Sequence, residues 1–317
     1  MAAKTLKPAT LEVVQAIEAA ISAPMVAAVS GGADSLALAA GALLVSRRKS
    51  LPLRAVVIDH GLQGESAEVS AAAVATLANL GVAADVVKVD VTPAGDGLEA
   101  AARAARYAAL AENADAGEVV LLGHTLDDQA ESVLLGLARG SGTRSLAGMP
   151  VTRGCFHRPL LGIRRSTTRE LCRELGISWW EDPQNHQDRF SRARVRQTLL
   201  PQMEAALGPG VVQALARTAK IAAADADYLD ELAGKYRGQN PAQEEGRLDC
   251  VWLSQLPPAI RSRVIRDWLR SCGAGELHAV HIAAVDALIL DWRGQKWIEV
   301  PRLRVFRRDG QLGTCLA

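Results

Sequence analysis

A short loop, Ser30–Ser35 (Ser-Gly-Gly-Ala-Asp-Ser), has the residue types needed to bind phosphate. Its two glycines let backbone N–H groups approach an anion, and the N-terminus of the helix predicted to follow attracts negative charge. Ser30 and Ser35 can donate hydroxyl hydrogen bonds to phosphate oxygens. Asp34 would repel bare phosphate, so its presence favours a Mg²⁺ ion between the two. The alternative is a helix start capped by Ser and Asp.

The same loop differs from the glycine-rich loops that serve γ-phosphoryl transfer. It contains no lysine, and the chain has no G-x-x-x-x-G-K-[ST] pattern. We therefore expect the loop to hold a pyrophosphate leaving group instead of transferring a γ-phosphoryl group.

Polar clusters follow three apolar runs that have the length of buried strands. The runs are 25–29, 53–58 and 118–122, and helical patterns of 12–18 residues separate successive strands. Strands that alternate with helices predict an open, mostly parallel sheet with helices on both faces, an α/β fold. Ligands bind beyond the carboxyl ends of such strands. The clusters after these runs, Ser30–Ser35, Asp59-His60 and His124–Asp128, should therefore meet in one site.

The third cluster combines one histidine with acids at the start of a predicted helix over 126–138. His124, Asp127, Asp128 and Glu131 fall within eight residues. The functional interpretation is Mg²⁺ binding and orientation of an incoming amine, with Asp127 or Asp128 helping to remove its proton. The alternative is that the acids only stabilise the helix N-terminus.

Arginines form two further groups. Arg103 and Arg106 lie three apart on one face of a predicted helix over 97–115, where they either face a site or are solvated. Arg192, Arg194 and Arg196 follow at a spacing of two, which suits contacts with RNA phosphates. The alternative for the second group is a surface loop paired with neighbouring acids.

Charge is distributed unevenly along the 317 residues. The net charge is only +1, but residues 1–150 carry 11 basic and 16 acidic side chains, whereas residues 151–317 carry 25 and 19. An acidic first half and a basic second half suit an ATP-binding domain followed by a surface for a polyanion. A chance asymmetry explains the counts equally well.

Cysteine spacing and hydropathy argue against several classes of protein. The five cysteines are scattered and form no Cys-x-x-Cys pair, which argues against zinc ribbons and iron–sulfur sites. No uncharged apolar run of about 20 residues is present, and no signal peptide is recognisable at the N-terminus. We expect a cytoplasmic protein without a membrane partner.

Several motifs together resemble one family. They are Ser30–Ser35, Val57–Leu62 with Glu65-Ser66, Ala102–Tyr107, Gly123–Ser132, Arg139–Gly142 with Gly148-Met149, Arg158–Leu161, Glu181–Asn185 and Phe190–Arg196, followed by Pro201. In combination they resemble the tRNA(Ile)-lysidine synthase family of the PP-loop (N-type) ATP pyrophosphatases. The family pattern usually has Arg, Thr and Gly where this chain has Gln63, Ser132 and Ser145.

The resemblance implies an activity and assigns site residues. ATP, with Mg²⁺, would adenylate the C2 oxygen of the wobble cytidine of an isoleucine tRNA, and free L-lysine would then displace AMP. Catalytic residues would be Asp34, Asp127, Asp128 and Arg106, with Asp34 and Asp127 on the metal. ATP would contact Ser30, Gly31, Gly32, Ala33, Asp34, Ser35, Asp59, His60 and His124. Arg103, Glu131 and Arg139 would bind lysine, and Arg192, Arg194 and Arg196 would bind the anticodon loop.

The resemblance also implies a division into three parts. Residues 1–197 would form the PP-loop domain, 198–235 a helical connector broken at Gly208–Gly210, and 236–317 a small α/β domain that binds substrate. In the last part the pattern predicts helices near 258–272 and 278–292 and strands near 296–300 and 303–307. Whether the protein is a monomer or a homodimer stays open.

Two other functions remain as alternatives. A tRNA thiolase of the same superfamily would need a reactive cysteine or cysteine pair, which the scattered thiols argue against. A non-catalytic nucleotide-binding module would keep the glycine loop but would have no need of the acids between His124 and Glu131.

Overall fold

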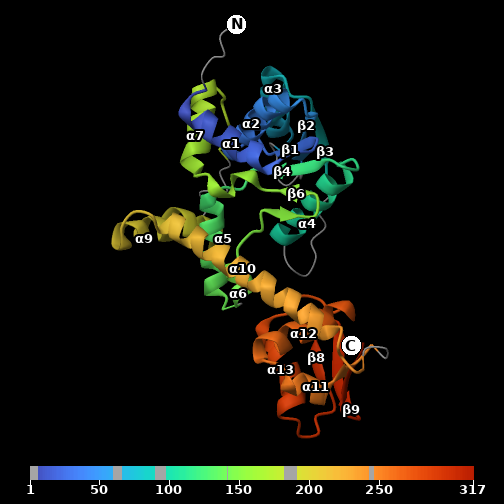
Figure 1. Cartoon of the computed structure of the whole chain (residues 1–317). Coiled ribbons are helices and arrows are strands. Elements are labelled where there is room, and N and C mark those ends of the chain that lie inside the picture. Colours follow the sequence, from blue (N-terminus) through green and yellow to red (C-terminus); the bar gives the residue numbers. More distant parts are fainter. Residues whose placement is uncertain (1–5, 60–65, 90–97, 141, 182–190, 243–245) are drawn as a thin grey trace. The chain divides into compact units, whose positions relative to one another are not determined.

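The computed structural model describes residues 6–59, 66–89, 98–140, 142–181, 191–242 and 246–317 (Figure 1). The chain forms two compact units, Met1–Ala138 with Gly148–Ala219, and Arg139–Ala147 with Lys220–Ala317. The three-part division with boundaries after residues 197 and 235 stays a prediction. No helix in the described part of the chain is both long and apolar enough to cross a membrane.

The first unit is built on a six-stranded sheet in the order β3-β2-β1-β4-β6-β5, in which only β5 runs antiparallel to its neighbour. Its strands are β1 (Met25–Val29), β2 (Leu53–Asp59), β3 (Ala84–Lys88), β4 (Val119–Leu122), β5 (Thr152–Arg153) and β6 (Phe156–His157). Its helices are α1 (Pro8–Ala20), α2 (Ala33–Lys49), α3 (Ser66–Leu80), α4 (Leu98–Glu112), α5 (Leu126–Ala138), η1 (Pro159–Gly162), α7 (Arg165–Leu175), α8 (Ser191–Arg194), η3 (Val195–Leu199) and α9 (Leu200–Leu207). The predicted parallel α/β fold is confirmed.

The central strand explains why both faces of the sheet carry helices. Every residue of β1 is buried. Met25, Ala27 and Val29 pack with α1, α2, α3 and α7 in one core, whereas Val26 and Ala28 pack with Leu110 of α4 in another. Because successive side chains of a strand point to opposite faces, an uninterrupted apolar run needs a helical layer on each side (Figure 1).

The segment 139–165, in which the sequence shows little periodicity, contains regular structure. It holds α6 (Thr143–Leu146), β5, β6 and η1. β6 extends the sheet beside β4, and β5 closes a short hairpin on it. Two-residue strands are too short to produce a periodic signal, so only pairing with β4 reveals them.

The side chain of Glu174, near the end of α7, caps the start of α1. α1 begins without a side-chain cap of its own, and Glu174 at the end of α7 accepts hydrogen bonds from Ala9 N (3.1 Å), Thr10 N (2.9 Å) and Thr10 Oγ1 (2.6 Å). The carboxylate thus caps a helix that lies more than 160 residues away in the sequence.

Replacing this cap should destabilise the first unit. We expect Glu174→Ala to lower the free energy of unfolding by about 1 kcal/mol, as for loss of an N-cap acceptor. Urea unfolding followed by circular dichroism measures the change. Glu174→Gln keeps an acceptor and should lose less; equal losses in the two variants would contradict the capping role.

The second unit combines helices with a four-stranded antiparallel sheet in the order β7-β10-β9-β8. Its elements are α6, the C-terminal part of α10 (Val211–Arg237), β7 (Leu248–Asp249), α11 (Cys250–Gln255), α12 (Pro258–Ser271), α13 (Ala279–Leu290), β8 (Ile298–Val300), β9 (Leu303–Arg308) and β10 (Gln311–Leu316). Both helices and both strands predicted over 258–307 are present. β10 is an additional strand that the sequence analysis did not predict.

A buried ion pair joins two helices of this second unit. Arg261 of α12 is only 5% exposed, and its Nε lies 2.6 Å from Asp286 Oδ1 on α13. Its Nη1 also donates to the carbonyl oxygen of Leu256 at 2.9 Å. Because Asp286 neutralises the guanidinium and the Leu256 carbonyl oxygen accepts one of its N–H groups, its burial does not leave an unpaired charge.

Candidate active site

The loop of residues 30–35 forms the N-terminus of α2. Gly32 is the N-cap residue, and the first helical hydrogen bond runs from Leu36 N to Gly32 O at 3.1 Å. The N–H groups of Ala33, Asp34 and Ser35 precede this bond, so the helix supplies them no acceptor. Their position is that of the anion site that the sequence predicts, and anion binding there stays a prediction.

Internal contacts fix the shape of this loop. Ser35 Oγ donates to Gly32 O (2.9 Å) and accepts from Ser30 N (3.1 Å), so this buried hydroxyl holds the loop closed. Gly31 has φ of +81°, a conformation that favours glycine. Ser30 is exposed and remains close to Ser35 Oγ, at 3.3 Å.

A glycine allows β4 to approach this loop closely. A Cβ atom on Gly123 would lie 3.0 Å from Asp34 O and 3.1 Å from Ser35 Cα. The backbone after β4 therefore touches the first turn of α2. This contact brings His124 and the acids of α5 next to the loop, as the strand-end argument predicts.

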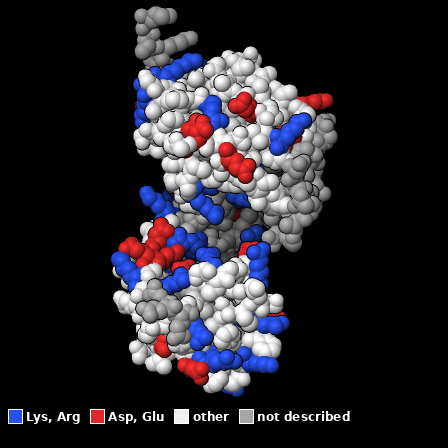
Figure 2. All heavy atoms as spheres, turned by 90° about the vertical axis from the view of Figure 1, so that its right-hand side faces the viewer, with Lys and Arg blue, Asp and Glu red and all other residues white. Residues whose placement is uncertain are grey.

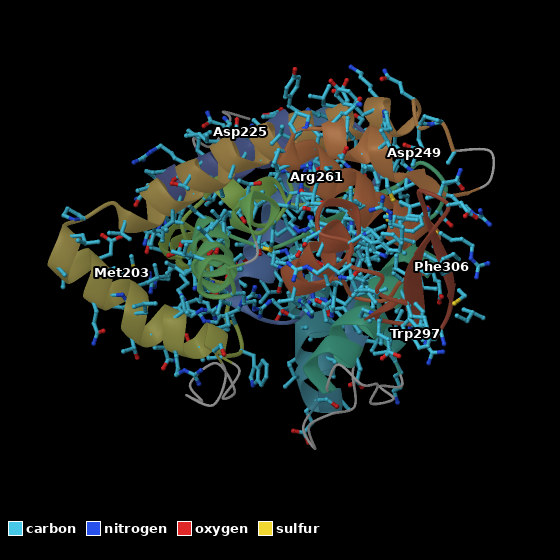
Figure 3. The ribbon with its side chains drawn as sticks, turned by 90° about the horizontal axis from the view of Figure 1, so that it is seen from below. Met203, Asp225, Asp249, Arg261, Trp297 and Phe306 are labelled. Carbon is cyan, nitrogen blue, oxygen red and sulfur yellow. The ribbon has the colours of Figure 1, made fainter. Side chains whose placement is uncertain are left out.

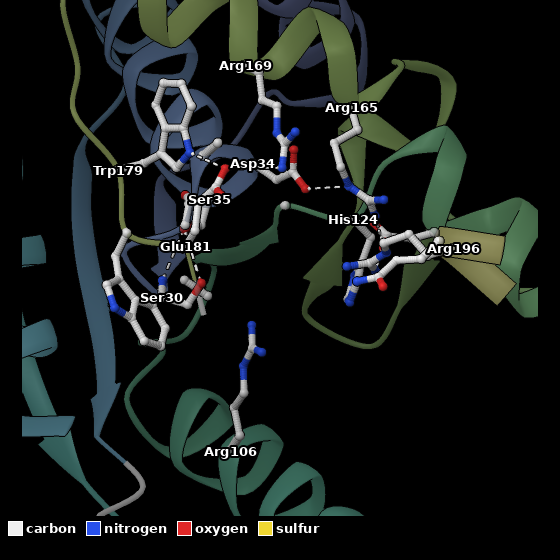
Figure 4. Close-up of a pocket in the computed structure, with 17 residues that line it drawn as sticks. Ser30, Asp34, Ser35, Arg106, His124, Arg165, Arg169, Trp179, Glu181 and Arg196 are labelled. Atoms are coloured by element: carbon white, nitrogen blue, oxygen red, sulfur yellow. Dashed lines mark hydrogen bonds and ion pairs between the residues drawn. The ribbon is translucent and has the colours of Figure 1, made fainter. Parts of the chain in front are cut away.

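A cavity of about 460 Å³ opens in front of the loop (Figure 4). Its wall combines the loop, the end of β4, α4, α5, α7 and the segments around 180 and 196. The lining residues are Ala28, Ser30, Gly32, Ala33, Asp34, Ser35, Arg106, Gly123, His124, Asp128, Arg165, Arg169, Trp179, Trp180, Glu181, Arg196 and Gln197.

One arginine of α7 joins the acids of this cavity. Arg165 lies 3.3 Å from Asp34 (Figure 4). It also lies 2.5 Å from Asp128 and 3.2 Å from Glu131. Burial lowers the pKa of its guanidinium, but these carboxylates and Asp127 raise it well above its ordinary value. Arg165 therefore stays charged and neutralises acids from two helices.

Asp34 and Asp128, two of the carboxylates in the cavity wall, have different proton affinities. Burial raises the pKa of Asp34, and Asp128 adds to this, although Arg165 and Thr168 oppose it. For Asp128 burial also acts upward, but Arg165, Arg196 and two hydrogen bonds from Thr125 at 2.8 Å bring the pKa below its ordinary value. Asp128 is thus firmly ionised, whereas Asp34 would gain from an additional cation.

The other two acids lie outside the cavity lining. Asp127 accepts from the Arg164 guanidinium at 3.1 and 3.2 Å and from Arg165 N at 2.8 Å, so it caps α7. Glu131 is fully buried and accepts from Arg196 at 2.7 and 3.0 Å and from Arg165. Asp127 thus positions Arg164, and Glu131 positions Arg165 and Arg196, which line the cavity.

Arg106 reaches into the cavity from α4 (Figure 4). Burial lowers the pKa of its guanidinium, with a further decrease from Arg103. Within the described part of the chain it has no ion-pair partner. Arg103 itself is exposed, stacks on Tyr107 at 5.1 Å and does not line the cavity. A half-buried guanidinium that no carboxylate of the described residues contacts is suited to an anionic ligand.

His124 lies in the wall, and its buried ring nitrogen Nδ1 has no hydrogen-bond partner among the residues that the structure describes. The pKa of the ring is lowered to about 3, mainly by burial; Asp128 opposes this shift, and Arg106 and Arg158 add to it. The ring is therefore neutral near pH 7. A neutral imidazole can accept or donate a hydrogen bond at a nucleotide without adding charge.

The burial of neutral His124 predicts a pH dependence of stability. Because the folded pKa lies below the ordinary value of 6.5, the unfolded state binds the proton first and stability is lost as pH falls below 6.5. For this group alone the loss reaches about 2 kcal/mol at pH 5.

Urea unfolding at pH 7 and pH 5 measures this loss. His124→Asn, which does not titrate in this range, should lose about 2 kcal/mol less than the wild type between the two pH values. An equal loss in both proteins would show that His124 titrates normally in the folded state.

The three arginines at a spacing of two lie on helical turns and fan out. Arg192 and Arg196 turn inward: Arg192 is 3.7 Å from Glu131, and Arg196 contacts both Glu131 and Asp128. Arg194 is exposed and donates to Ser191 Oγ at 3.3 Å. Contacts of these arginines with RNA stay a prediction.

Three further predicted residues lie elsewhere. Asp59 ends β2 and is buried, but it is not part of the cavity lining. His60 lies outside the described residues. Arg139 belongs to the second unit, where it is exposed. Their assignments to ATP and lysine stay predictions.

The sequence analysis missed the residues that α7 contributes. Arg164, Arg165 and Thr168 all contact acids of the site, and Arg169 lines the cavity and pairs with Glu181 at 3.4 Å. The sequence contained a usable signal, because two adjacent arginines, Arg164 and Arg165, stand at the start of this helix. Cations are disfavoured at a helix N-terminus, so this pattern indicates nearby acids.

Comparisons with known proteins agree with this geometry. Residues 7–203 match the PP-loop domain family, and residues 248–312 match the TilS substrate binding domain. A tRNA(Ile)-lysidine synthase of Mycolicibacterium paratuberculosis is 50% identical over 292 residues, covering 90% of this chain and 88% of that protein. One from Rhodococcus opacus is 46% identical and covers 98% and 97%.

The fold has a more distant structural relative. A U34-tRNA thiolase, NcsA from Methanococcus maripaludis, superposes with a TM-score of 0.53 at 18% identity, covering 67% of this chain and 78% of that one. This likeness extends to the fold alone. The sequence relatives carry the finer assignment: the chain belongs to the tRNA(Ile)-lysidine synthase family of PP-loop proteins.

Proposed function

We propose that this protein attaches free L-lysine to C2 of the wobble cytidine of an isoleucine tRNA. ATP adenylates the C2 oxygen and releases pyrophosphate; the lysine ε-amine then attacks C2, loses a proton and expels AMP. The observation that carries the proposal is one cavity that combines the phosphate loop with the carboxylates of Asp34 and Asp128. The relatives named tRNA(Ile)-lysidine synthase support the choice of substrate.

ATP would bind with its phosphates at the N-terminus of α2. The N–H groups of Ala33, Asp34 and Ser35 would contact phosphate oxygens. No group of three or more acidic, histidine or cysteine side chains among the described residues is arranged to hold a metal. Mg²⁺ commonly needs only one or two carboxylates, because substrate phosphates and water complete its shell. Asp34, with its raised pKa, fits that role, and bound Mg²⁺ would neutralise phosphate charge.

Arg106 would act on the opposite side of the bound nucleotide. It lines the cavity, and no acid among the described residues pairs with it, so its charge would act on the negative charge that develops at the α-phosphate. A preorganised cation in a water-poor site stabilises such charge more strongly than in water.

The lysine ammonium would bind against Asp128. This carboxylate is ionised and lies in the cavity wall, whereas Asp127 is occupied by Arg164 and the start of α7. We therefore favour Asp128 over Asp127 as the group that orients the amine and accepts its proton. Glu131 would act indirectly, by holding Arg165 and Arg196.

The cytidine base must leave the anticodon stack to enter the cavity. Trp179 and Trp180 line the entrance beside Glu181, and an indole ring can stack on an unpaired base. Trp180 N donates to Gly31 O at 3.0 Å, which ties this segment to the phosphate loop. Exposed Arg194 would contact RNA phosphates.

The deciding experiment incubates the purified protein with ATP, Mg²⁺, radiolabelled lysine and total tRNA. We expect lysine-dependent label in tRNA that co-migrates with lysidine after nuclease digestion, with AMP and pyrophosphate as products. Incorporation of sulfur instead would identify a thiolase, and ATP binding without tRNA-dependent AMP release would identify a non-catalytic module. Sedimentation in the same buffer distinguishes monomer from homodimer, and fractionation tests the cytosolic location that a tRNA substrate implies.

A further inference from the structure

The second unit has a sheet with one covered and one open face. In β9, Leu303 and Val305 are buried in the core of this unit. Arg304, Phe306 and Arg308 alternate with them and therefore point to the other side. We call this side the outer sheet face and define it by Trp297, Arg304, Phe306, Arg308 and Gly313.

Strand register places two aromatic residues of neighbouring strands on the outer sheet face. The antiparallel register pairs Glu299 with Arg304 and Ile298 with Val305, which brings Trp297, just before β8, across from Phe306 (Figure 3). Trp297 is 39% exposed, and Phe306 is half-buried.

Phe306 lies against a glycine on the neighbouring strand. Gly313 is paired with Phe306 in the β9–β10 register, and a Cβ atom at Gly313 would stand 2.7 Å from the phenyl Cζ. Only glycine lets the ring lie close to the sheet. A ring held flat in this way forms a platform instead of projecting into solvent.

Cations lie next to both rings, and one acid of the same face, Glu299, pairs with Arg304 at 3.4 Å. The Arg304 guanidinium lies 5.3 Å and Lys296 Nζ 4.7 Å from the centroid of Trp297, and the Arg308 guanidinium lies 5.8 Å from that of Phe306. Residues 291–309 contain six basic and three acidic side chains. Figure 2 shows basic side chains gathered on the lower end of this unit.

We propose that the outer sheet face binds unpaired nucleotides of the tRNA substrate. Bases would stack on Phe306 and Trp297, and Arg304, Arg308 and Lys296 would contact the phosphates that flank them. Aromatic platforms on open antiparallel sheets bind single-stranded RNA in this manner, because every base has a face that can stack. A duplex keeps its base faces covered, and an apolar protein partner would be poorly matched to the basic surroundings.

The proposal rests on the function inferred above, since it specifies how the same tRNA is held. It also gives the match of residues 248–312 to a substrate binding domain a defined contact surface.

The test measures binding of the full-length protein to an unstructured RNA of about 12 nucleotides, to a blunt RNA duplex and to tRNA. Phe306→Leu and Trp297→Leu keep apolar volume but remove the aromatic face. Each should weaken binding of the unstructured RNA and of tRNA by about 5-fold or more. Phe306→Tyr keeps the ring and should bind within about 2-fold of the wild type.

Trp292 supplies a matched control. It is 48% exposed and stacks on Arg307 at 5.0 Å, but Arg307 points to the helical side, where it donates to Leu288 O at 2.8 Å. We expect Trp292→Leu to bind unstructured RNA like the wild type. Equal effects of Trp292→Leu and Trp297→Leu would overturn the proposal in favour of a general basic surface.

Other outcomes are equally decisive. Wild-type affinity in Phe306→Leu, or stronger binding of the duplex than of the unstructured RNA, would reject an aromatic platform. Dimerisation of the wild type that Phe306→Leu abolishes would identify a second copy as the occupant. Failure of the proposed function is a separate result, because it would leave wild-type protein without lysidine formation whatever these binding constants are.

Discussion

Asp34→Asn should reduce lysidine formation by roughly 1,000-fold, the equivalent of about 4 kcal/mol of transition-state stabilisation. The substitution removes the only carboxylate in the first turn of α2, directly beside the three free N–H groups. Burial raises the pKa of Asp34 in spite of Arg165, so the carboxylate favours a further cation. Without its charge, the proposed Mg²⁺ site would lose its carboxylate, and the phosphates would keep only the backbone N–H groups of the loop.

Single-turnover formation of lysidine at several Mg²⁺ concentrations measures this effect. The asparagine variant should need more Mg²⁺ for ATP binding than the wild type, in addition to its lower rate. Asp225→Asn, on an exposed acid of α10, is the control and should behave as the wild type. Full lysine incorporation by Asp34→Asn would show that the metal role is wrong.

Arg165→Ala should lower the free energy of unfolding by about 3 kcal/mol at pH 7. Removing one partner from a buried ion pair leaves uncompensated charge, which typically costs about 3–5 kcal/mol. The lower end applies because Arg196 still contacts Asp128 and Glu131. The exposed pair of Arg169 with Glu181, whose side chains are 45% and 54% exposed, provides the control. Arg169→Ala should cost less than about 1 kcal/mol.

The difference between Arg165→Ala and the wild type should shrink in acid. The folded pKa of Asp128 in the wild type lies below its ordinary value of 3.8. Its stabilising contribution is therefore present above that pH and is lost as pH falls towards the folded pKa. In the variant Asp34 and Asp128 lose the positive charge of Arg165, which raises their pKa values. They therefore take up protons at a higher pH than in the wild type, and this relieves the repulsion between them.

Urea unfolding at pH 7 and pH 4.5 tests the direction of this pH dependence. The loss caused by Arg165→Ala should be smaller at pH 4.5 than at pH 7. Arg165→Lys should be intermediate at both, because one ammonium group cannot reach three carboxylates as a planar guanidinium does. A loss that is independent of pH would mean that Arg165 stabilises the fold by packing instead of charge.

Several features followed from local sequence alone. The run Met25–Val29 predicts a strand buried on both faces, and Ser30–Ser35 predicts a phosphate loop, because strand burial and helix-terminus chemistry depend on neighbours in the chain. The helix 126–138 was also predicted with its observed ends. These elements sufficed to place the loop beside His124 and Asp128.

Other features were decided only by tertiary structure. Arg165 is separated from Asp34 by 131 positions, and no local spacing reveals that one guanidinium neutralises acids of two different helices. Likewise, Asp127 and Asp128 are adjacent in sequence, yet one caps α7 and the other faces the cavity. Neighbouring helix positions differ by about 100° in direction, so packing assigns them to different partners.

In the second unit, too, one feature could not be predicted from local sequence. The sequence shows that residues 291–309 are basic and contain aromatic side chains, but it does not show which rings share a face. Pairing of β9 with β10 sets Phe306 over Gly313, and pairing with β8 brings Trp297 beside it. Charge and composition are properties of the chain, whereas a stacking surface requires the strand register that the long-range hydrogen bonds of the sheet impose.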